Sequence, residues 1–486
     1  MKKLFIIFSA LILLAAAGCN NAERNSSDGS DSIAPTTDST ENSSADAEHS
    51  NNEPGSPGEL TVLTDTVMQY FDVAACGTDD GLYYMDPPRI GSGGSYLYYI
   101  DYATKQEIYV CPDSACTHNN ERCVSYFDGS EFSTKYSKLF VYGESLFYLS
   151  LSYHESDGAV STSYGGAGGG GTLWQMNLDG TDRRCVFTFD DELTVESFAA
   201  CDGEKLWFVV STPELGYNAQ TQMYWSYLKD MAVIGVSISD HKVVDRLPLP
   251  NDERTAFYRI EGCAGDKFIF TATEYPEGVT KQDVFGLWAE RDLSIPFTET
   301  TEQDIKTDEI EARSSKVYYT LDRATGDFSE LYRYPYNTFF TNSVRFDDKI
   351  YLMQPDSAVT IDVKSGTVSE GALTAAEGYD VKGIFGDMYL CSSLSDPDDR
   401  AAYFIDPDTG VVGKTELRSN KYPEDTIVSD VAAIGREYVL IRTGEIAIPN
   451  KHLGIAGYYY EYAVEKLDDF FGGKDALETV RIIPKG

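Results

Sequence analysis

The chain has 486 residues, with 78 acidic and 39 basic side chains and a formal net charge of −39 at pH 7. Nucleic acid and anionic lipid headgroups repel a polyanion of this kind, so the charge argues against both as direct partners, and we expect a monomer. The 34 tyrosines and 24 phenylalanines favour strands, and no long helical periodicity is found except near the C-terminus.

Residues 1–18 have the three zones of a signal peptide. Lys2 and Lys3 give a positive start, an apolar run too short for a membrane span follows, and small residues precede Cys19. This end resembles the bacterial lipobox, although Ala16 stands where most lipoboxes have Leu. The resemblance implies that Cys19 is the lipidation site and the diacylated N-terminus of the mature protein. An ordinary secretory signal with a stray cysteine is the alternative. We expect a protein anchored to the outer face of the cytoplasmic membrane, at the cell surface.

Residues 19–58 are predicted to form a disordered tether. After the cysteine they are almost entirely Ser, Asp, Asn, Glu, Thr, Pro and Ala. Such a segment cannot bury enough apolar surface to offset the entropy of ordering. Residues 59–486 are then left as one domain with a large core.

A two-part module recurs along residues 59–486. Its first half is an apolar strand, a tight polar turn and a second strand, and its second half is another hairpin. The first halves lie at 73–85, 139–150, 198–210, 260–272, 344–353, 381–391 and 431–441. The second halves lie at 97–110, 173–187, 317–332, 359–371 and 403–417, with weaker copies at 233–247 and 459–471.

Each module supplies four strands, and the uninterrupted modules recur at about 42 to 45 residues, as propeller blades do. In three second halves an Asp precedes by four residues a Gly that closes the turn, as Asp322 precedes Gly326. A four-stranded blade cannot cover both of its faces alone, whereas radial packing covers them. We therefore predict an all-β fold, a β-propeller of seven four-stranded blades, with six or eight still possible and an irregular pair of β-sandwiches as the alternative. Residues 59–63 are expected to pair with residues 478–483 and close the ring.

Five cysteines fall in predicted strands. Cys76, Cys201 and Cys263 occupy one slot of the module, where other copies have Val or Ile, so we predict that these thiols are small core residues. Cys185 and Cys391 also lie within strand patterns, and we expect them to be buried likewise.

Three further cysteines lie with a histidine in one loop, "CPDSACTHNNERC", as Cys111, Cys116, His118 and Cys123. Thiolate and imidazole are the ligands of tetrahedral zinc sites, so this set could hold a structural zinc. The spacing differs from that of common zinc knuckles, and a Cys111–Cys116 or Cys116–Cys123 disulfide or a reduced loop stays open. Four protein ligands would leave no open coordination position, so a zinc here would cross-link the loop and would not be catalytic.

Two short motifs, "LYYID" (97–101) and "IDPDTGVV" (405–412), resemble those of TolB-like and YWTD-like propellers. The Cys/His-rich loop after the first such hairpin is similar to that of lipoproteins from anaerobic Gram-positive bacteria that carry a propeller domain of unknown function. The resemblance implies a fold and a cell-surface setting, but no activity, because propellers host many unrelated functions. The repeats lack the Trp that ends quinoprotein repeats, which argues against pyrroloquinoline quinone.

Three insertions, 152–171, 212–231 and 275–315, separate the two halves of a module, so we predict that they lie on one side of the ring. Their aromatic side chains either form a contact surface for sugar or protein or pack the insertions onto the blades. These candidate ligand-binding residues are Tyr217, Tyr224, Trp225, Tyr227 and Trp288.

No convergent catalytic motif is found, and five histidines leave few general bases, so no catalytic residue is assigned. The favoured hypothesis is a non-catalytic binding or scaffolding module that recognises a protein or glycan through the inserted loops. The competing hypothesis is a polysaccharide lyase or hydrolase that acts outside the cell, with carboxylates or tyrosines around the central channel as acid and base.

Overall fold

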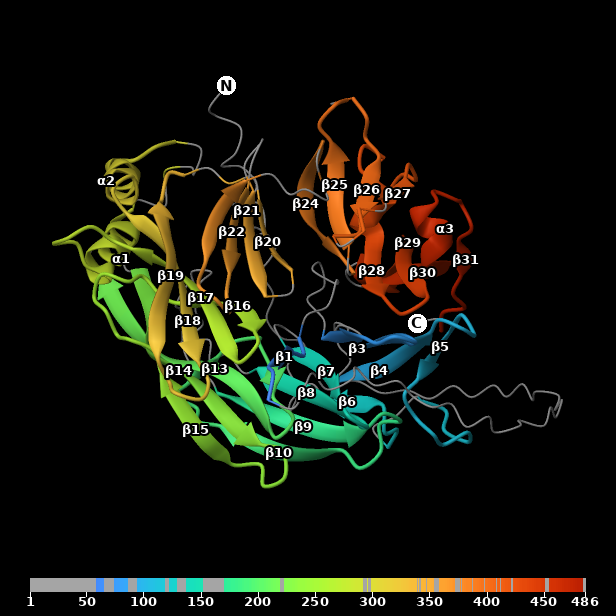
Figure 1. The fold of residues 1–486 in the computed structure, drawn as a ribbon. Coiled ribbons are helices and arrows are strands. Elements are labelled where there is room, and N and C mark those ends of the chain that lie inside the picture. The colour runs from blue at the N-terminus through green and yellow to red at the C-terminus, as the bar shows by residue number, and fades with distance from the viewer. Residues whose placement is uncertain are drawn as a thin grey trace.

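Seven antiparallel sheets, one per predicted module, follow one another around a ring in this computed structural model (Figure 1). The structure describes residues 58–64, 74–85, 94–118, 122–128, 137–151, 170–218, 223–291, 295, 299–338, 340, 342–346, 348–353, 358–371, 376, 378–386, 388–396, 398–407, 409–410, 412–420, 423–450 and 454–483. The prediction of a seven-bladed β-propeller is confirmed. Within the described part of the chain, no helix is long and apolar enough to cross a bilayer.

In each blade the strands pair in chain order from the inner edge to the outer edge. Blade 1 contains β2 (Ala75–Gly77), β3 (Gly81–Met85), β4 (Gly94–Asp101) and β5 (Gln106–Tyr109), with β6 (Tyr126–Asp128) also on β4. Blade 2 contains β7 (Lys138–Tyr142), β8 (Ser145–Leu151), β9 (Gly171–Asn177) and β10 (Arg184–Phe189). Blade 3 contains β12 (Ala200–Cys201), β13 (Lys205–Asn218), β14 (Met223–Ser237) and β15 (Val243–Pro248), with β11 (Thr194–Val195) on β13 and β1 (Thr61–Val62) on β12.

Blades 4 to 7 repeat the same plan. Blade 4 contains β16 (Arg259–Ala264), β17 (Lys267–Glu274), β18 (Ser315–Asp322) and β19 (Phe328–Pro335), and blade 5 contains β20 (Asn342–Phe346), β21 (Lys349–Met353), β22 (Ala358–Asp362) and β23 (Val368–Gly371). Blade 6 contains β24 (Tyr379–Phe385), β25 (Met388–Ser393), β26 (Ala402–Ile405) and β27 (Val412–Thr415). Blade 7 contains β28 (Val431–Ile434), β29 (Tyr438–Asn450), β30 (Gly454–Lys466) and β31 (Glu478–Thr479).

The Asp–Gly turns close the outer hairpins as their chemistry predicts. Asp322 accepts the amides of Ala324 and Thr325 at 3.0 and 2.8 Å, and these bonds favour the carboxylate form. Gly326 follows with a φ of 73°, which costs a glycine little, and donates its amide to the Asp322 carbonyl at 2.9 Å. The strands on either side are thereby joined in the register that buries one face.

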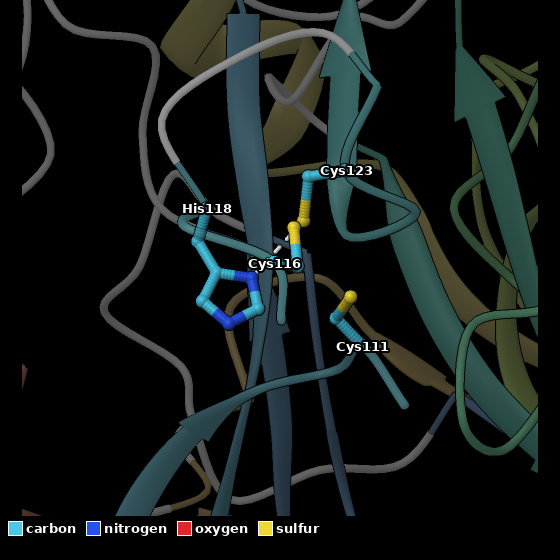
Figure 2. Close-up of side chains that lie close together, drawn as sticks. All are labelled: Cys111, Cys116, His118 and Cys123. Carbon is cyan, nitrogen blue, oxygen red and sulfur yellow. Dashed lines mark hydrogen bonds between the residues drawn. The ribbon is translucent and has the colours of Figure 1, made fainter. Parts of the chain in front are cut away.

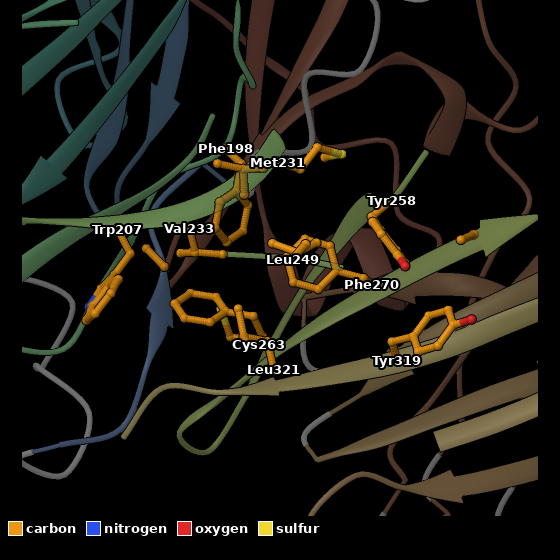
Figure 3. Close-up of a cluster of buried hydrophobic side chains, with 14 of the residues drawn as sticks. Phe198, Trp207, Met231, Val233, Leu249, Tyr258, Cys263, Phe270, Tyr319 and Leu321 are labelled. Carbon is orange, nitrogen blue, oxygen red and sulfur yellow. The ribbon is translucent and has the colours of Figure 1, made fainter. Parts of the chain in front are cut away.

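The core lies between neighbouring blades. At the junction of blades 3 and 4, Trp207 from β13 meets Phe268 from β17 with ring centroids 5.6 Å apart, and both side chains are buried. Figure 3 shows Trp207 with other buried residues of this cluster. The same cluster takes residues from the inner, second and third strands of both blades. Each blade thus covers an apolar face with that of its neighbour, which is why the repeat folds as a ring.

The predicted ring closure is wrong. Residues 59–63 do not pair with residues 478–483, because β1 pairs with β12 of blade 3, Thr61 opposite Cys201 and Val62 opposite Ala200. Leu60 and Leu63 are buried there, at 8% and 9% exposure, so this pairing removes two large apolar side chains from water.

Helices are present where the sequence was interpreted as strand or loop. The weak copy at 459–471 is not a hairpin, since β30 runs into α3 (Leu467–Phe471) and the outer strand β31 has two residues. The insertion at 275–315 holds α1 (Lys281–Glu290) and α2 (Glu302–Glu311). Thr280 and Thr301 cap these helices, each in a capping box with the Asp three residues later.

Two of the three insertions, which were predicted to lie with the third on one side of the ring, belong to elements that contact each other. Residues 212–231 extend the hairpin of β13 and β14, and the paired register continues to Asn218 opposite Met223. Helix α1 joins the second and third strands of blade 4 and contacts both β13 and β14 (Figure 1). Residues 152–169 of the first insertion lie outside the described residues.

Candidate metal centre

The Cys/His loop interrupts the outer edge of blade 1. β5 pairs with residues 98–101 of β4, whereas β6 pairs with residues 94–96 of the same strand. Between these two stretches the Leu97 amide donates to the Ser125 carbonyl at 2.8 Å, and the Leu97 carbonyl accepts the Val110 amide at 3.0 Å. The chain therefore leaves the sheet at residue 110, makes the loop and returns at residue 125, so that both ends of the loop start from one fixed point.

This geometry brings the four predicted ligands together. The thiols of Cys111, Cys116 and Cys123 and the imidazole of His118 place one ligand atom each within 4.8 Å of all the others (Figure 2). In a tetrahedral zinc site with Zn–S bonds of about 2.3 Å, two ligand sulfurs are about 3.8 Å apart. His118 Nδ1 lies 3.3 Å from Cys123 Sγ, close to the separation of two ligands on one zinc. The cluster can therefore bind a metal ion after small shifts, and all three cysteines are free thiols.

Neighbouring side chains orient two of the ligands. The Tyr109 ring stacks on the His118 imidazole with centroids 4.3 Å apart and an interplanar angle of 18°. The buried Ser125 hydroxyl lies 3.0 Å from Cys123 Sγ, where it can donate a hydrogen bond to a thiolate. The stacking with Tyr109 fixes the plane of the His118 ring, and the contact with Ser125 positions the Cys123 sulfur.

Burial governs the proton state of both groups. It raises the pKa of the Cys123 thiol to about 11, although the Ser125 hydroxyl and amide act in the opposite direction. It also lowers the pKa of His118, against the attraction of Asp113, so the imidazole is neutral at pH 7. A neutral imidazole is ready to coordinate, whereas the Cys123 thiol must release its proton when a metal binds.

Blade 2 supports the two ends of the loop. Gly180, in the turn between β9 and β10, has a φ of 82°, and a Cβ there would lie 2.6 Å from the Val110 carbonyl oxygen. Arg183 from the same turn donates to the Val124 and Tyr126 carbonyls at 3.3 and 2.8 Å. The loop is therefore held by the next blade as well as by its own sheet.

The other cysteines divide as their strand positions dictate. Cys76, Cys201, Cys263 and Cys391 are buried, which confirms that they are core residues. The expectation for Cys185 is wrong: its side chain is exposed, because β10 is the outermost strand of blade 2. The alternation of a strand pattern shows that a residue lies in a strand, but it does not show whether that strand lies inside a blade or at its outer edge.

The predicted contact residues come from neighbouring elements. Tyr217 lies opposite Tyr224 in the extended hairpin, and Trp225 and Tyr227 are on β14, but the surroundings of these four side chains lie outside the described residues. Trp288 on α1 is 55% exposed. The predicted lipidation residue, Cys19, also lies outside the described residues.

A polar cluster that sequence reasoning missed lies on the inner and third strands of blade 4 and on the inner strand of blade 5. We call it the inner polar cluster, and its residues are Arg259 and Glu261 on β16, Lys316 and Tyr318 on β18, and Arg345 on β20. Arg259 Nε lies 3.7 Å from Glu261 Oε1, and Arg345 Nη1 donates to the Glu261 carbonyl at 3.2 Å. Burial lowers the pKa of Lys316, against the attraction of Glu311.

Gly262 leaves the space in which Arg345 packs against blade 4. Gly262 has a φ of 144°, and a Cβ there would lie 1.2 Å from Arg345 Nη1. The guanidinium thus occupies the space that a side chain would need. A bulge at this glycine, between Ile260 and Gly262, shifts the register of β16. No local motif marks this arrangement, because its members come from three strands of two blades.

No protein-family model matches the sequence, and no curated protein matches it. Among solved structures, the chain is similar to the acylaminoacyl peptidase of Pyrococcus horikoshii, with 8% identity over 85% of this chain and 54% of that one and a TM-score of 0.41. It is similar to the dipeptidyl peptidase 4 of Porphyromonas gingivalis, with 12% identity over 84% and 59% and a TM-score of 0.40. An oligogalacturonate lyase in complex with manganese aligns with 10% identity over 79% and 87% and a TM-score of 0.35. This chain spans a little over half the length of the two peptidases, and overlaps of this quality carry no information about activity.

Proposed function

We propose that the protein is a lipid-anchored, non-catalytic propeller that binds a glycan or protein at the outer face of the cytoplasmic membrane. The observation that carries the binding role is the packing of α1 from blade 4 against the extended hairpin of blade 3, with Trp288 exposed beside it. An exposed indole on a short, packed helix offers a flat apolar surface at a small entropic cost, as sugar and protein ligands require. The anchor is lipid on Cys19, the first residue of the tether of residues 19–58.

We further propose that the metal is zinc and that its role is structural. Three thiols and one imidazole are soft and borderline ligands, which suit zinc and not manganese, calcium or magnesium. The set fills all four tetrahedral positions, so no position is left for a water or a substrate.

The binding role is tested on the chain that begins at residue 58. The protein is applied to an array of defined bacterial and host glycans, and affinities are measured for those that bind. Trp288→Ala is expected to weaken binding about tenfold, the effect of losing one aromatic anchor. Val412→Ala, at a 45% exposed position on blade 6, is expected to leave affinity unchanged. Equal affinity of the Trp288 variant and the wild type would remove this surface from the proposal.

The zinc site and the anchor have separate tests. Elemental analysis of the purified chain is expected to give about one zinc per chain, lost in Cys116→Ala and kept in Cys185→Ala. A metal-free, fully folded wild type would refute the zinc site. Mass spectrometry of the membrane fraction is expected to find a diacylated N-terminal peptide that begins at Cys19, and Cys19→Ser is expected to be released from membranes.

A second candidate is a polysaccharide lyase or hydrolase, because the inner polar cluster joins a carboxylate, a tyrosine and a lysine with a lowered pKa to two arginines. Perturbed titratable groups beside charge partners are typical of acid–base sites. Ultraviolet absorbance of unsaturated sugars and reducing-end assays on acidic and neutral polysaccharides detect the two reactions. Activity that is lost in Glu261→Gln and Lys316→Ala would establish the enzyme; absence of turnover on the polysaccharides that bind would leave the binding module.

A further inference from the structure

The short strand β5 is held along both of its edges. One edge pairs with β4, from Tyr98 opposite Tyr109 to Asp101 opposite Gln106. Along the other edge runs the C-terminal segment 480–483, which bridges to β5 in parallel at Gln106. The Glu107 amide donates to the Arg481 carbonyl at 3.0 Å. β5 therefore joins its own blade to the end of the chain.

A buried carboxylate strengthens this junction. Glu107 is 4% exposed, and its carboxylate accepts the Ile483 amide at 2.8 Å and the Tyr84 hydroxyl from β3. An amide and a hydroxyl directed at one carboxylate offset part of the cost of its burial. If β5 moves, the Ile483 amide loses this partner.

These contacts close the outer half of the seam between blades 1 and 7. The two blades share no strand, since β2 to β5 and β28 to β31 form separate sheets. Near the inner end of the seam, Arg436 donates its amide to the Asp79 carbonyl at 3.0 Å and pairs with the Asp79 carboxylate. At the outer end, β5 and the C-terminal segment lie together beside the chain end (Figure 1). Closure there depends on a strand of four residues.

The metal cluster begins where β5 ends. Tyr109, the last residue of β5, stacks on His118, and its carbonyl accepts the Cys111 amide at 2.7 Å. An ion that ties Cys111 and His118 to Cys123 would fix the outer end of β5 to the base of β6. We propose that metal binding at this cluster holds β5 in place and thereby closes the outer half of the seam between blades 1 and 7. This inference rests on the zinc site proposed above and adds a conformational role to it.

The physical reason is local stability. A four-residue strand next to a 13-residue loop without a cross-link opens at a small cost in free energy, because the loop gains entropy. The metal removes that entropy by closing the loop. The C-terminal segment pairs with β5, so it is released when β5 opens.

Hydrogen exchange measured by mass spectrometry tests the coupling. Exchange of the mature chain is measured with one equivalent of zinc and again after chelation, in peptides that cover 105–110 and 478–483. Zinc is expected to slow exchange about tenfold in both peptides, because both belong to one opening unit. Zinc is expected to leave exchange in β21 and β22 of blade 5 unchanged. Cys185→Ala, the control variant, is expected to respond to zinc as the wild type does. Cys116→Ala is expected to exchange like the chelated wild type.

A second variant distinguishes closure of the seam between blades 1 and 7 from zinc binding at the Cys/His cluster. Glu107→Ala is expected to keep one zinc per chain but to exchange rapidly at 478–483 with or without zinc. Bound zinc with unchanged exchange at 478–483 in the wild type would overturn the seam role and leave the zinc site intact. Failure to bind zinc would refute both. Faster exchange in blade 5 on chelation would also overturn the seam role, because the ion would then support the whole fold.

Discussion

A buried ion pair fixes the first described residues of the chain to the ring. Arg323 donates to the Asp202 carboxylate at 2.5 Å and to the Gly58 carbonyl at 2.7 Å, and the Trp207 indole donates to the same carboxylate at 3.0 Å. The Asp202 side chain is 2% exposed. Burial by itself raises the pKa of Asp202, but the amides of Glu204 and Lys205, the indole and Arg323 together lower it below its ordinary value. The carboxylate form therefore stabilises the folded protein.

Asp202→Asn is expected to lower the free energy of unfolding at pH 7 by about 3 kcal/mol, because it removes the opposite charge from the largely buried Arg323 guanidinium. A lowered pKa means that the stabilisation is complete above the ordinary pKa of 3.8 and is lost as the pH falls through the lower pKa of the folded state. The difference between variant and wild type should thus shrink below that pH in urea unfolding. Lys306→Ala, which removes an exposed pair with Glu302, is the control and should show no measurable change. A difference that is constant with pH would show that Asp202 is not ionised in the folded state.

The turns between third and fourth strands act differently from blade to blade, although their sequences are similar. Gly366 in the turn of blade 5 has a φ of 69°, and a Cβ there would have no described atom within 4 Å, whereas Gly180 in blade 2 lies against the Val110 carbonyl next to the Cys/His cluster. A glycine at positive φ is thus only part of a turn in one blade, whereas in the other it also makes a contact between blades.

Gly180→Ala and Gly366→Ala form a matched pair at the scale of the turn. Both substitutions place alanine at positive φ, at about 1–2 kcal/mol each. Gly180→Ala adds a steric conflict with Val110 and is expected to cost about 1–3 kcal/mol more. Denaturant unfolding of the two variants measures this difference. Equal losses would show that blade 2 adjusts without strain and does not position the loop.

At the scale of the whole molecule, a segment that precedes blade 1 in the chain contacts three blades of the ring. β1 pairs with the inner strand of blade 3, and the Leu60 amide donates to the Gly265 carbonyl of blade 4 at 2.8 Å. Lys364 of blade 5 lies 3.7 Å from Glu59 and pairs at 2.5 Å with Asp348. Residues 58–63 therefore connect three consecutive blades on the inner side of the ring.

A chain that begins at residue 58 is expected to fold as stably as the mature protein, whereas one that begins at residue 65 is expected to lose about 3–6 kcal/mol. Leu60 and Leu63 are both buried, and burial of one such side chain contributes about 1.5–3 kcal/mol. Urea unfolding of the two chains gives the comparison. Equal stability of both would mean that the segment rests on the ring without supporting it.

The sequence alone determined the repeat and the four members of the Cys/His cluster, and it favoured seven blades over six or eight. Alternation of apolar residues and Asp–Gly turns act over a few residues, and Cys111 to Cys123 lie within one loop, so local patterns suffice to find them. The capping boxes at Thr280 and Thr301 were equally local, and they could have revealed both helices of the insertion.

Only the tertiary structure decided how the ring closes and which residues from different blades meet. β1 could satisfy its backbone at any free strand edge, and the choice of β12 depends on the apolar space around Leu60 and Leu63. The inner polar cluster and the contact between Glu107 and the C-terminal segment join residues far apart in the chain. Pairings of this kind depend on the packing of several blades at once, and the sequence of a single strand does not indicate them.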